Sequence, residues 1–209
     1  MRRRGCGAAF AVVLLALAWE FSMVSAAWGA CRPRTMVRDF PAASVRLASF
    51  AVAAETGAAR ADVTVEWFGH SFFRLTSKSD TRIVTDPLAP GMYPTPKISA
   101  HAVTVGREHR NHNAVEIVEG NPGVLRGLTE FGAEWRRVQT QVREVEIRSI
   151  PVYHTGYETG PMKGAAFTYN FGRVCVAHLG DLAGLLTPRQ LEELGRVDVL
   201  LIPIGGRFT

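Results

Sequence analysis

The stretch HAVTVGREHRNHN, residues 101–113, decides how this chain folds. Its apolar residues 102–105 predict a short buried strand, and the glycine that follows releases the chain into a polar loop. That loop carries His109 and His112. Asn113, with a glutamate three residues further on, predicts the capped start of a helix. The histidines therefore lie in a turn between a strand end and a helix start, where α/β sheets place their chemistry.

Two imidazoles this close in sequence can bind one metal ion, because neutral imidazole nitrogen is a good donor to zinc-like metals. Histidines in polar loops are more often only solvated, so the pair alone is weak evidence. Further candidates stand at the ends of other predicted strands: His70, Asp86, His154 and Asp181. Their presence raises the odds of a functional site.

The composition is that of a globular protein with one sizeable core: 209 residues, 47% hydrophobic and 21% charged. It does not suggest a disordered or coiled-coil class. The net charge of +5 lies partly in Arg2, Arg3 and Arg4, so it says little about a partner. The arginines at 136, 137 and 143 are interpreted as a solvated strand face, because no aromatic residues interleave with them. No nucleic-acid partner is expected.

The first thirty residues have the layout of a secretory signal peptide. Three arginines precede the apolar run 8–19, and the small-residue stretch 25–30 follows it. An uncleaved N-terminal anchor and lipid attachment at Cys31 are the alternatives. We therefore expect an exported protein that is periplasmic, extracellular or held at a membrane through this segment alone.

Residues 31–61 are rich in alanine and arginine and show no clean period, so they are interpreted as a tether before a domain spanning 62–209. Cys175 lies in an apolar run and is interpreted as a small core residue. A disulfide between Cys31 and Cys175 is allowed in an oxidising compartment.

The domain is predicted to place strands first and then to alternate strand and helix. Thr187, Pro188 and Gln190 predict a capped helix that Gly195 ends. The run 197–204, apolar apart from Asp198, predicts a strand buried on both faces. The other predicted strands are 62–67, a second ending near 75, 82–85, 102–105, 123–126, 141–147, 152–154, 165–169 and 173–177.

Six landmarks occur in a characteristic order: WFGHSFF (67–73), TDP (85–87), VTVGREHRNHN (103–113), PVYH (151–154), HLGD (178–181) and LLIPIGG (200–206). On these the chain resembles the metallo-β-lactamase superfamily, in the branch of ascorbate-6-phosphate lactonases and N-acyl-phosphatidylethanolamine phospholipase D. The resemblance implies an α/β (α+β) fold, an αββα sandwich that here lacks its C-terminal strand and helix. It also implies one or two bound metal ions, usually zinc.

The family's metal-binding loop reads H-x-H-x-D-H, and this chain departs from it at two positions. Laid on GREHRNH, the pattern puts Arg107 at the first histidine, His109 at the second, Asn111 at the aspartate and His112 at the last. Arginine stays protonated and has no lone pair to give, so Arg107 removes a ligand and adds a positive charge. Asn111 offers only a neutral carbonyl oxygen.

The resemblance implies a first metal position with His109, His154 and Asp181 as ligands and an open fourth place. A second position would keep only His112 and Asp181, so one zinc or other divalent ion is expected rather than two. His70, Asp86 and Asn111 are expected to support the ligands rather than to bind metal.

The first functional hypothesis is a metal-dependent hydrolase, in which metal-activated water attacks an ester, lactone or phosphoester. Asp181, His109 and Arg107 are the expected catalytic residues, with Arg107 holding an anionic group of a small-molecule substrate. The alternative is a non-catalytic, metal-poor relative that binds a ligand or partner, in which Arg107 pairs with Asp181. A third possibility is a truncated chain, since the family's final histidine would lie beyond Thr209.

Overall fold

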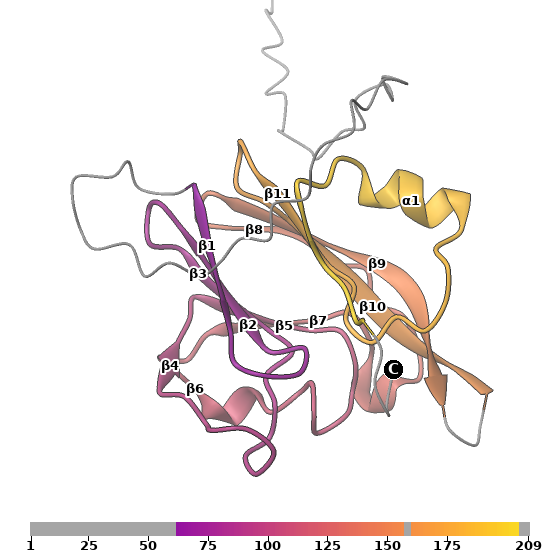
Figure 1. Ribbon diagram of the computed structural model, residues 1–209, viewed down its shortest axis with the longest axis horizontal. Coiled ribbons are helices and arrows are strands. Elements are labelled where there is room, and N and C mark those ends of the chain that lie inside the picture. Colours follow the sequence, from indigo (N-terminus) through magenta and orange to yellow (C-terminus); the bar gives the residue numbers. More distant parts are fainter. Residues whose placement is uncertain (1–61, 157–159, 205–209) are drawn as a thin grey trace, which may run out of the picture.

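The structure is a computed structural model that describes residues 62–156 and 160–204. Its centre is a sandwich of two five-stranded sheets (Figure 1). The first sheet has the order β1-β2-β3-β5-β7, with β1 Val63–Trp67, β2 Phe73–Ser77, β3 Arg82–Thr85, β5 Ala102–Val105 and β7 Gly123–Arg126. The second has the order β12-β11-β10-β9-β8, with β8 Gln139–Val142, β9 Val145–Gly156, β10 Gly160–Asn170, β11 Cys175–His178 and β12 Val199–Leu201. The predicted signal peptide and tether lie outside the described residues.

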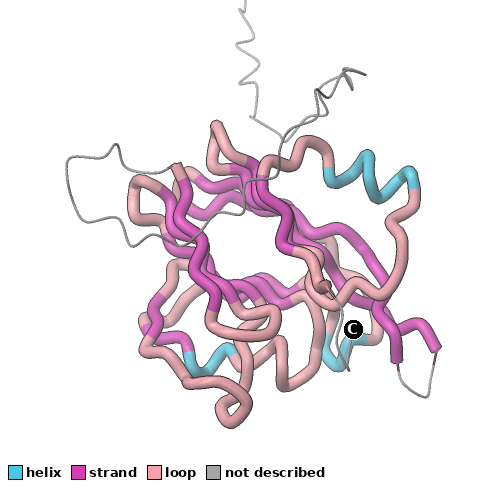
Figure 2. Tube along the Cα trace, viewed as in Figure 1, coloured by secondary structure: helices cyan, strands magenta, loops and turns pink. Residues whose placement is uncertain are grey.

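Three apolar clusters define the layers. The cluster between the sheets includes the fully buried Leu75, Ile83, Phe167 and Tyr169. The outer face of the first sheet is covered by β4 (Ile98–Ser99), β6 (Val118–Glu119) and the 3-10 turn η1 (Val115–Ile117). The outer face of the second is covered by helix α1 (Pro188–Leu194), which lies apart from the first sheet in Figure 2. The predicted two-sheet α+β sandwich is therefore confirmed.

Helix α1 begins and ends as its sequence predicts. The Thr187 hydroxyl accepts a hydrogen bond from the Gln190 backbone N–H at 3.3 Å, and the Gln190 side-chain oxygen accepts one from the Thr187 N–H at 2.8 Å. Gly195 follows the helix with φ of 66°, a conformation that glycine adopts without strain. Among the described residues, no helix is long and apolar enough to cross a membrane.

The carboxyl ends of several strands meet at one edge of the sandwich. Strands β3, β5 and β7 run parallel, as do β11 and β12 in the other sheet. The two sheets are joined there by a hydrogen bond of 2.8 Å from the Ala165 N–H to the Gly106 carbonyl. Gly106 is required at this contact, because a β-carbon on it would lie 2.5 Å from the Ala165 oxygen. The loop that follows β5 is therefore held directly over the second sheet.

Three predicted elements, one helix and two strands, differ from the elements of the structure. No capped helix starts at Asn113: the 3-10 turn η1 is only three residues long, and it has no side-chain cap. The Asn113 amide instead donates to the Glu108 carboxylate at 3.2 Å. The predicted single strand 141–147 is a hairpin of β8 and β9, turning at Arg143 with φ of 55°. β9 then continues through 152–154, which was predicted as a separate strand.

The predicted strand 197–204 is also wrong in extent and burial. Only Val199–Leu201 form β12, and within the described residues β12 lies at the edge of its sheet, beside β11 alone. Leu200 is 48% exposed and Ile204 is 95% exposed. An apolar sequence favours a buried strand, but the strand is buried only where other elements pack on both of its faces.

Candidate metal centre

Four loops bring the polar residues of the site together. His70 lies in the turn between β1 and β2, with φ of 52°, and Asp86 directly follows β3, with φ of 40°. His112 lies in the loop after β5, and Asp181 in the loop after β11. Positive φ is rare for residues other than glycine and costs free energy, so its occurrence at two site residues marks a conformation fixed by its surroundings.

Asp86 connects the strand ends to the histidine loop. Its Oδ1 accepts a hydrogen bond of 2.7 Å from the Gly106 N–H, and its Oδ2 lies 2.9 Å from His112 Nδ1. Both side chains are fully buried. A carboxylate only accepts, so it holds the proton on Nδ1 and leaves Nε2 of a neutral His112 with its lone pair directed away. This is the arrangement that orients a metal-binding histidine, as the prediction of a supporting Asp86 requires.

The donor group consists of His70, His112 and Asp181, whose ligand atoms lie within 4.8 Å of one another. His70 Nε2 is 3.1 Å from His112 Nε2, and His112 Nε2 is 3.3 Å from Asp181 Oδ2. Asp181 Oδ1 is buried and accepts no hydrogen bond from the described residues. Buried carboxylate oxygens are rarely left unpartnered, so two imidazoles and this oxygen fit a divalent cation such as zinc.

A guanidinium lies against the same carboxylate. Arg107 NH1 forms an ion pair with Asp181 Oδ2, and the Arg107 side chain is 21% exposed. Although burial acts in the opposite direction, His112 and Arg107 hold the pKa of Asp181 well below its usual range. Asp181 is therefore ionised at neutral pH. The pair is the one expected of Arg107 in the metal-poor alternative.

The two histidines of the donor group differ in charge. Burial lowers the pKa of His112, but its hydrogen bonds to Asp181 and Asp86 outweigh that and raise the pKa to about 9. Burial, followed by the charge of His112, lowers the pKa of His70. Without a cation the site thus holds a protonated His112 beside a neutral His70. His112 Nε2 would have to release its proton to hold a metal ion here.

Of the predicted ligands, the structure brings Asp181 and His112 together but not His109 and His154. His109 is exposed, its ring centroid is 6.5 Å from that of His112, and its Nδ1 accepts from the Asn111 N–H at 3.3 Å. His154 is buried on β9, where it lies opposite Met162 of β10. Neither contributes to the donor group, so the ligand roles assigned to His109 and His154 stay predictions.

His70 belongs to the donor group, although the sequence predicted only a supporting role for it. Its sequence signals were its position at a predicted strand end and within the landmark WFGHSFF, and neither indicates its distance from His112. His101 and His178 both have structural contacts outside the donor group. His101 Nδ1 accepts from the Arg82 N–H at 2.9 Å, and the buried His178 packs edge-on against Phe73 with ring centroids 5.7 Å apart.

An aromatic cavity of about 390 Å³ opens beside the donor group, and His70 forms part of its wall. Trp67 and Tyr93 meet edge-on in it, with ring centroids 6.1 Å apart. Ile202 and Pro203 line the opposite part. A substrate that reaches the donor group therefore finds an apolar surface next to it.

Two stacked sheets with a histidine and carboxylate group at one edge define a metallo-hydrolase type of architecture. The family model described as "Beta-lactamase superfamily domain" matches residues 64–209. The chain belongs to this superfamily, as its sequence landmarks predicted.

Similar proteins carry matching descriptions. UPF0173 metal-dependent hydrolases from Natranaerobius thermophilus and Thermococcus onnurineus are each 28% identical, over 69% and 70% of this chain and 72% and 74% of theirs. A Thermotoga maritima structure, classed as a Zn-dependent hydrolase of the metallo-beta-lactamase superfamily, is 35% identical with a TM-score of 0.53. That match covers 69% of this chain and 63% of the other. The expectation of a metallo-hydrolase is confirmed at the level of the family.

Proposed function

We propose that the protein is a metal-dependent hydrolase whose metal, zinc or another divalent ion, is held by His70, His112 and Asp181. The observation that carries the proposal is the convergence of their ligand atoms within 4.8 Å of one another, beside a buried Asp181 Oδ1 that accepts no hydrogen bond from a described residue. The names of the related hydrolases support it. A metal ion bound there would lower the pKa of a coordinated water towards neutrality.

The chain's own residues fix the geometry around that ion. Asp86 holds the ring of His112, and Asp181 supplies the negative charge that offsets the cation. Arg107 lies at the mouth of the group, where its planar fork can bind a carboxylate or phosphate oxygen of a substrate. The aromatic cavity takes the apolar part of the same molecule. An ester, lactone or phosphoester with an apolar substituent satisfies all three features.

The test combines metal analysis with a substrate panel. Purified protein is expected to contain about one equivalent of zinc, manganese or iron and to hydrolyse at least one aryl ester, lactone or phosphoester. His112→Ala should lose both properties. The control is His101→Gln, at a histidine that hydrogen-bonds the Arg82 backbone outside the donor group. Wild-type protein that is folded, binds no added metal and hydrolyses nothing in the panel contradicts the proposal.

The second candidate is a metal-poor binding protein, and the Arg107–Asp181 ion pair favours it. In that case Arg107 and the protonated His112 together replace the missing cation. Zinc titration separates the two candidates, because a metal-poor protein gains no thermal stability from zinc, whereas a hydrolase site does.

We also propose that the protein is exported. The support is the sequence of residues 1–30, in which arginines, an apolar run and small residues follow one another. Residues 31–61 would then tether the catalytic domain. Fractionation of cells that express the full chain tests this: a shortened, exported product is expected, and full-length protein confined to the cytoplasm contradicts it.

A further inference from the structure

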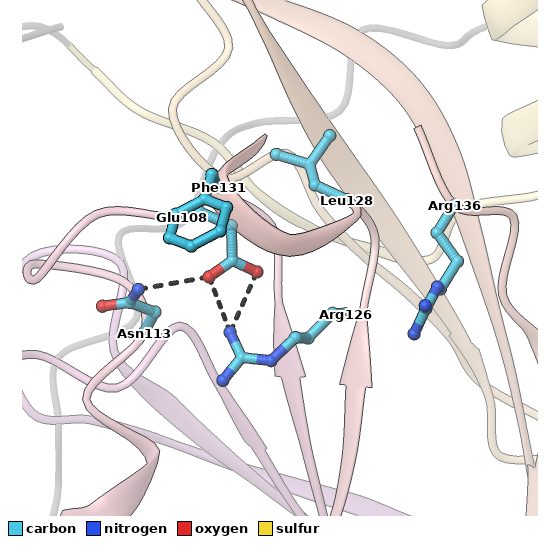
Figure 3. Close-up of a pocket in the computed structure, with 6 residues that line it drawn as sticks. All are labelled: Glu108, Asn113, Arg126, Leu128, Phe131 and Arg136. Carbon is cyan, nitrogen blue, oxygen red and sulfur yellow. Dashed lines mark hydrogen bonds and ion pairs between the residues drawn. The ribbon is translucent and has the colours of Figure 1, made fainter. Parts of the chain in front are cut away.

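A second cavity, of about 510 Å³, lies beside the same loop but shares no lining residue with the donor group. Figure 3 shows its walls, which come from the loop after β5, the end of β7 and the segment before β8. The lining residues are Glu108, Asn113, Arg126, Leu128, Phe131 and Arg136. The proposed hydrolase function makes no use of this cavity.

Glu108 fixes the orientation of Arg126. Its carboxylate oxygens lie 2.9 Å and 2.6 Å from Arg126 NH1, and its Oε2 also accepts from the Asn113 amide at 3.2 Å (Figure 3). The Glu108 side chain is only 11% exposed. Two of these contacts hold the Arg126 guanidinium and the third holds the nearly buried carboxylate itself, which lowers the entropy cost of ordering Arg126 when a ligand binds.

The cavity has more positive than negative charge. Both contacts with Glu108 use the same terminal nitrogen of Arg126, which leaves Nε and the second terminal nitrogen without a partner among the described residues. Arg136 lies on the opposite side in Figure 3, and its guanidinium forms no ion pair with a described residue. One carboxylate therefore faces two guanidinium groups. The neighbouring Arg137 differs, since it pairs with Glu193 at 3.2 Å.

An apolar surface adjoins these charges. Phe131 is 90% exposed and has φ of 63°, a left-handed conformation that a bulky aromatic residue rarely adopts. An exposed ring held at a free-energy cost at the edge of a cavity suggests a use for that ring. A flat apolar group can pack on Phe131 while an attached anion reaches the arginines.

We propose that this cavity binds a small organic oxyanion, either a carboxylate or a phosphate monoester, that carries a flat apolar group. Arg126 and Arg136 hold the oxyanion through charge-assisted hydrogen bonds, and Phe131 covers the apolar group. The site is separate from the donor group, although Glu108 and Asn113 belong to the loop that carries Arg107 and His112.

Calorimetric titration of the full chain, treated with EDTA to remove metal, tests the proposal. The probes are phenyl phosphate, benzoate, inorganic phosphate and phenol. Phenyl phosphate or benzoate should bind, and phenol should not. Arg136→Gln should raise the Kd of the bound probe about tenfold, whereas Arg137→Gln, a matched exposed arginine, should leave it unchanged. Phe131→Ala should weaken phenyl phosphate to the level of inorganic phosphate.

Three outcomes overturn the proposal. The first is a Kd that is the same in wild type and Arg136→Gln, and the second is no binding of either aromatic anion by wild type. The third is binding abolished by Arg107→Gln but not by Arg136→Gln, which assigns the anion to the donor group. Arg136 and Arg137 are both exposed, so their glutamine variants should fold, and the unfolding midpoints of these variants verify this. Failure here leaves the proposed hydrolase function intact, because no metal or activity is measured.

Discussion

The aspartate behind the donor group offers a sharp test of the site, through the nearly isosteric substitution Asp86→Asn. Asp86 makes two buried contacts, with the Gly106 N–H at 2.7 Å and with His112 Nδ1 at 2.9 Å. An asparagine can accept from only one of them. If its oxygen keeps the Gly106 bond, its amide N–H₂ faces Nδ1, so a neutral His112 must carry its proton on Nε2. That tautomer cannot bind a metal ion through Nε2.

The magnitude follows from these contacts. Losing the carboxylate that orients a metal-binding histidine is expected to lower metal affinity about 10–100-fold. In the reverse orientation, the amide opposes the Gly106 N–H and leaves a buried donor unsatisfied. Either way a buried hydrogen bond to a charged carboxylate is replaced by a neutral one or lost, so the free energy of unfolding should fall by about 1–3 kcal/mol. Both effects have the same cause, and both should appear in one variant.

Zinc affinity by competition with a chelating dye, together with urea unfolding of the metal-free protein, measures the two quantities. Asp198→Asn is the matched control, because Asp198 Oδ2 also accepts a backbone N–H, that of Cys175 at 2.8 Å, at the opposite end of β11 from Asp181. It should reduce stability without changing zinc affinity. Asp86→Asn that binds zinc as tightly as wild type would refute the assignment of His112 Nε2 as a ligand.

Three further predictions address the charge, the acid stability and the packing of the domain. Arg107→Gln should raise zinc affinity about tenfold, because it removes a cation beside the donor group; an unchanged affinity in the dye assay places the metal elsewhere. Burial raises the pKa of Glu144, but hydroxyl hydrogen bonds from the β2–β3 turn outweigh it and lower the pKa. The stability that this provides is present above pH 4.5 and is lost as pH falls. Glu144→Gln should therefore flatten the acid side of a plot of the unfolding midpoint against pH. A plot identical to that of wild type contradicts this. Gly106→Ala should destabilise the protein by about 1–3 kcal/mol in urea, since its β-carbon would lie 2.5 Å from the Ala165 oxygen, whereas Gly184→Ala has open space and should not.

Most strands could be predicted from the sequence, because turn residues mark where they end. Residues 82–85, 102–105 and 123–126 are strands with the predicted bounds, each with a turn residue, a proline or a glycine nearby. Prediction failed where the outcome depended on contacts distant in sequence. The run 197–204 is apolar apart from Asp198, yet only β11 pairs with it among the described residues, so most of it is neither strand nor buried.

The sequence predicted which types of residue form the site, but it did not predict which histidines lie next to Asp181. The conclusion that Asp181 and a loop histidine meet needed only strand ends and the family pattern. The choice between His109 and His112 depends on which ring turns inward, and that is decided by the hydrogen bond that His112 Nδ1–H donates to the Asp86 carboxylate. His70 joins the group because its turn adopts φ of 52°, a backbone detail that no residue spacing encodes.

The loop after β5 links the donor group to the second cavity, because neighbouring residues of the loop have partners in different places. Arg107 pairs with Asp181 in the donor group, while Glu108 pairs with Arg126 in the second cavity. The first bond of this loop to the second sheet is made by Gly106, so a substitution that displaces Gly106 must disturb the donor group and the second cavity together. Arg136 comes from a different segment and touches only the second cavity. Zinc binding should therefore weaken in Gly106→Ala and persist in Arg136→Gln, whereas anion binding should weaken in both. Anion binding that survives in Gly106→Ala while zinc binding is lost would show that the loop does not position Glu108 and Arg126.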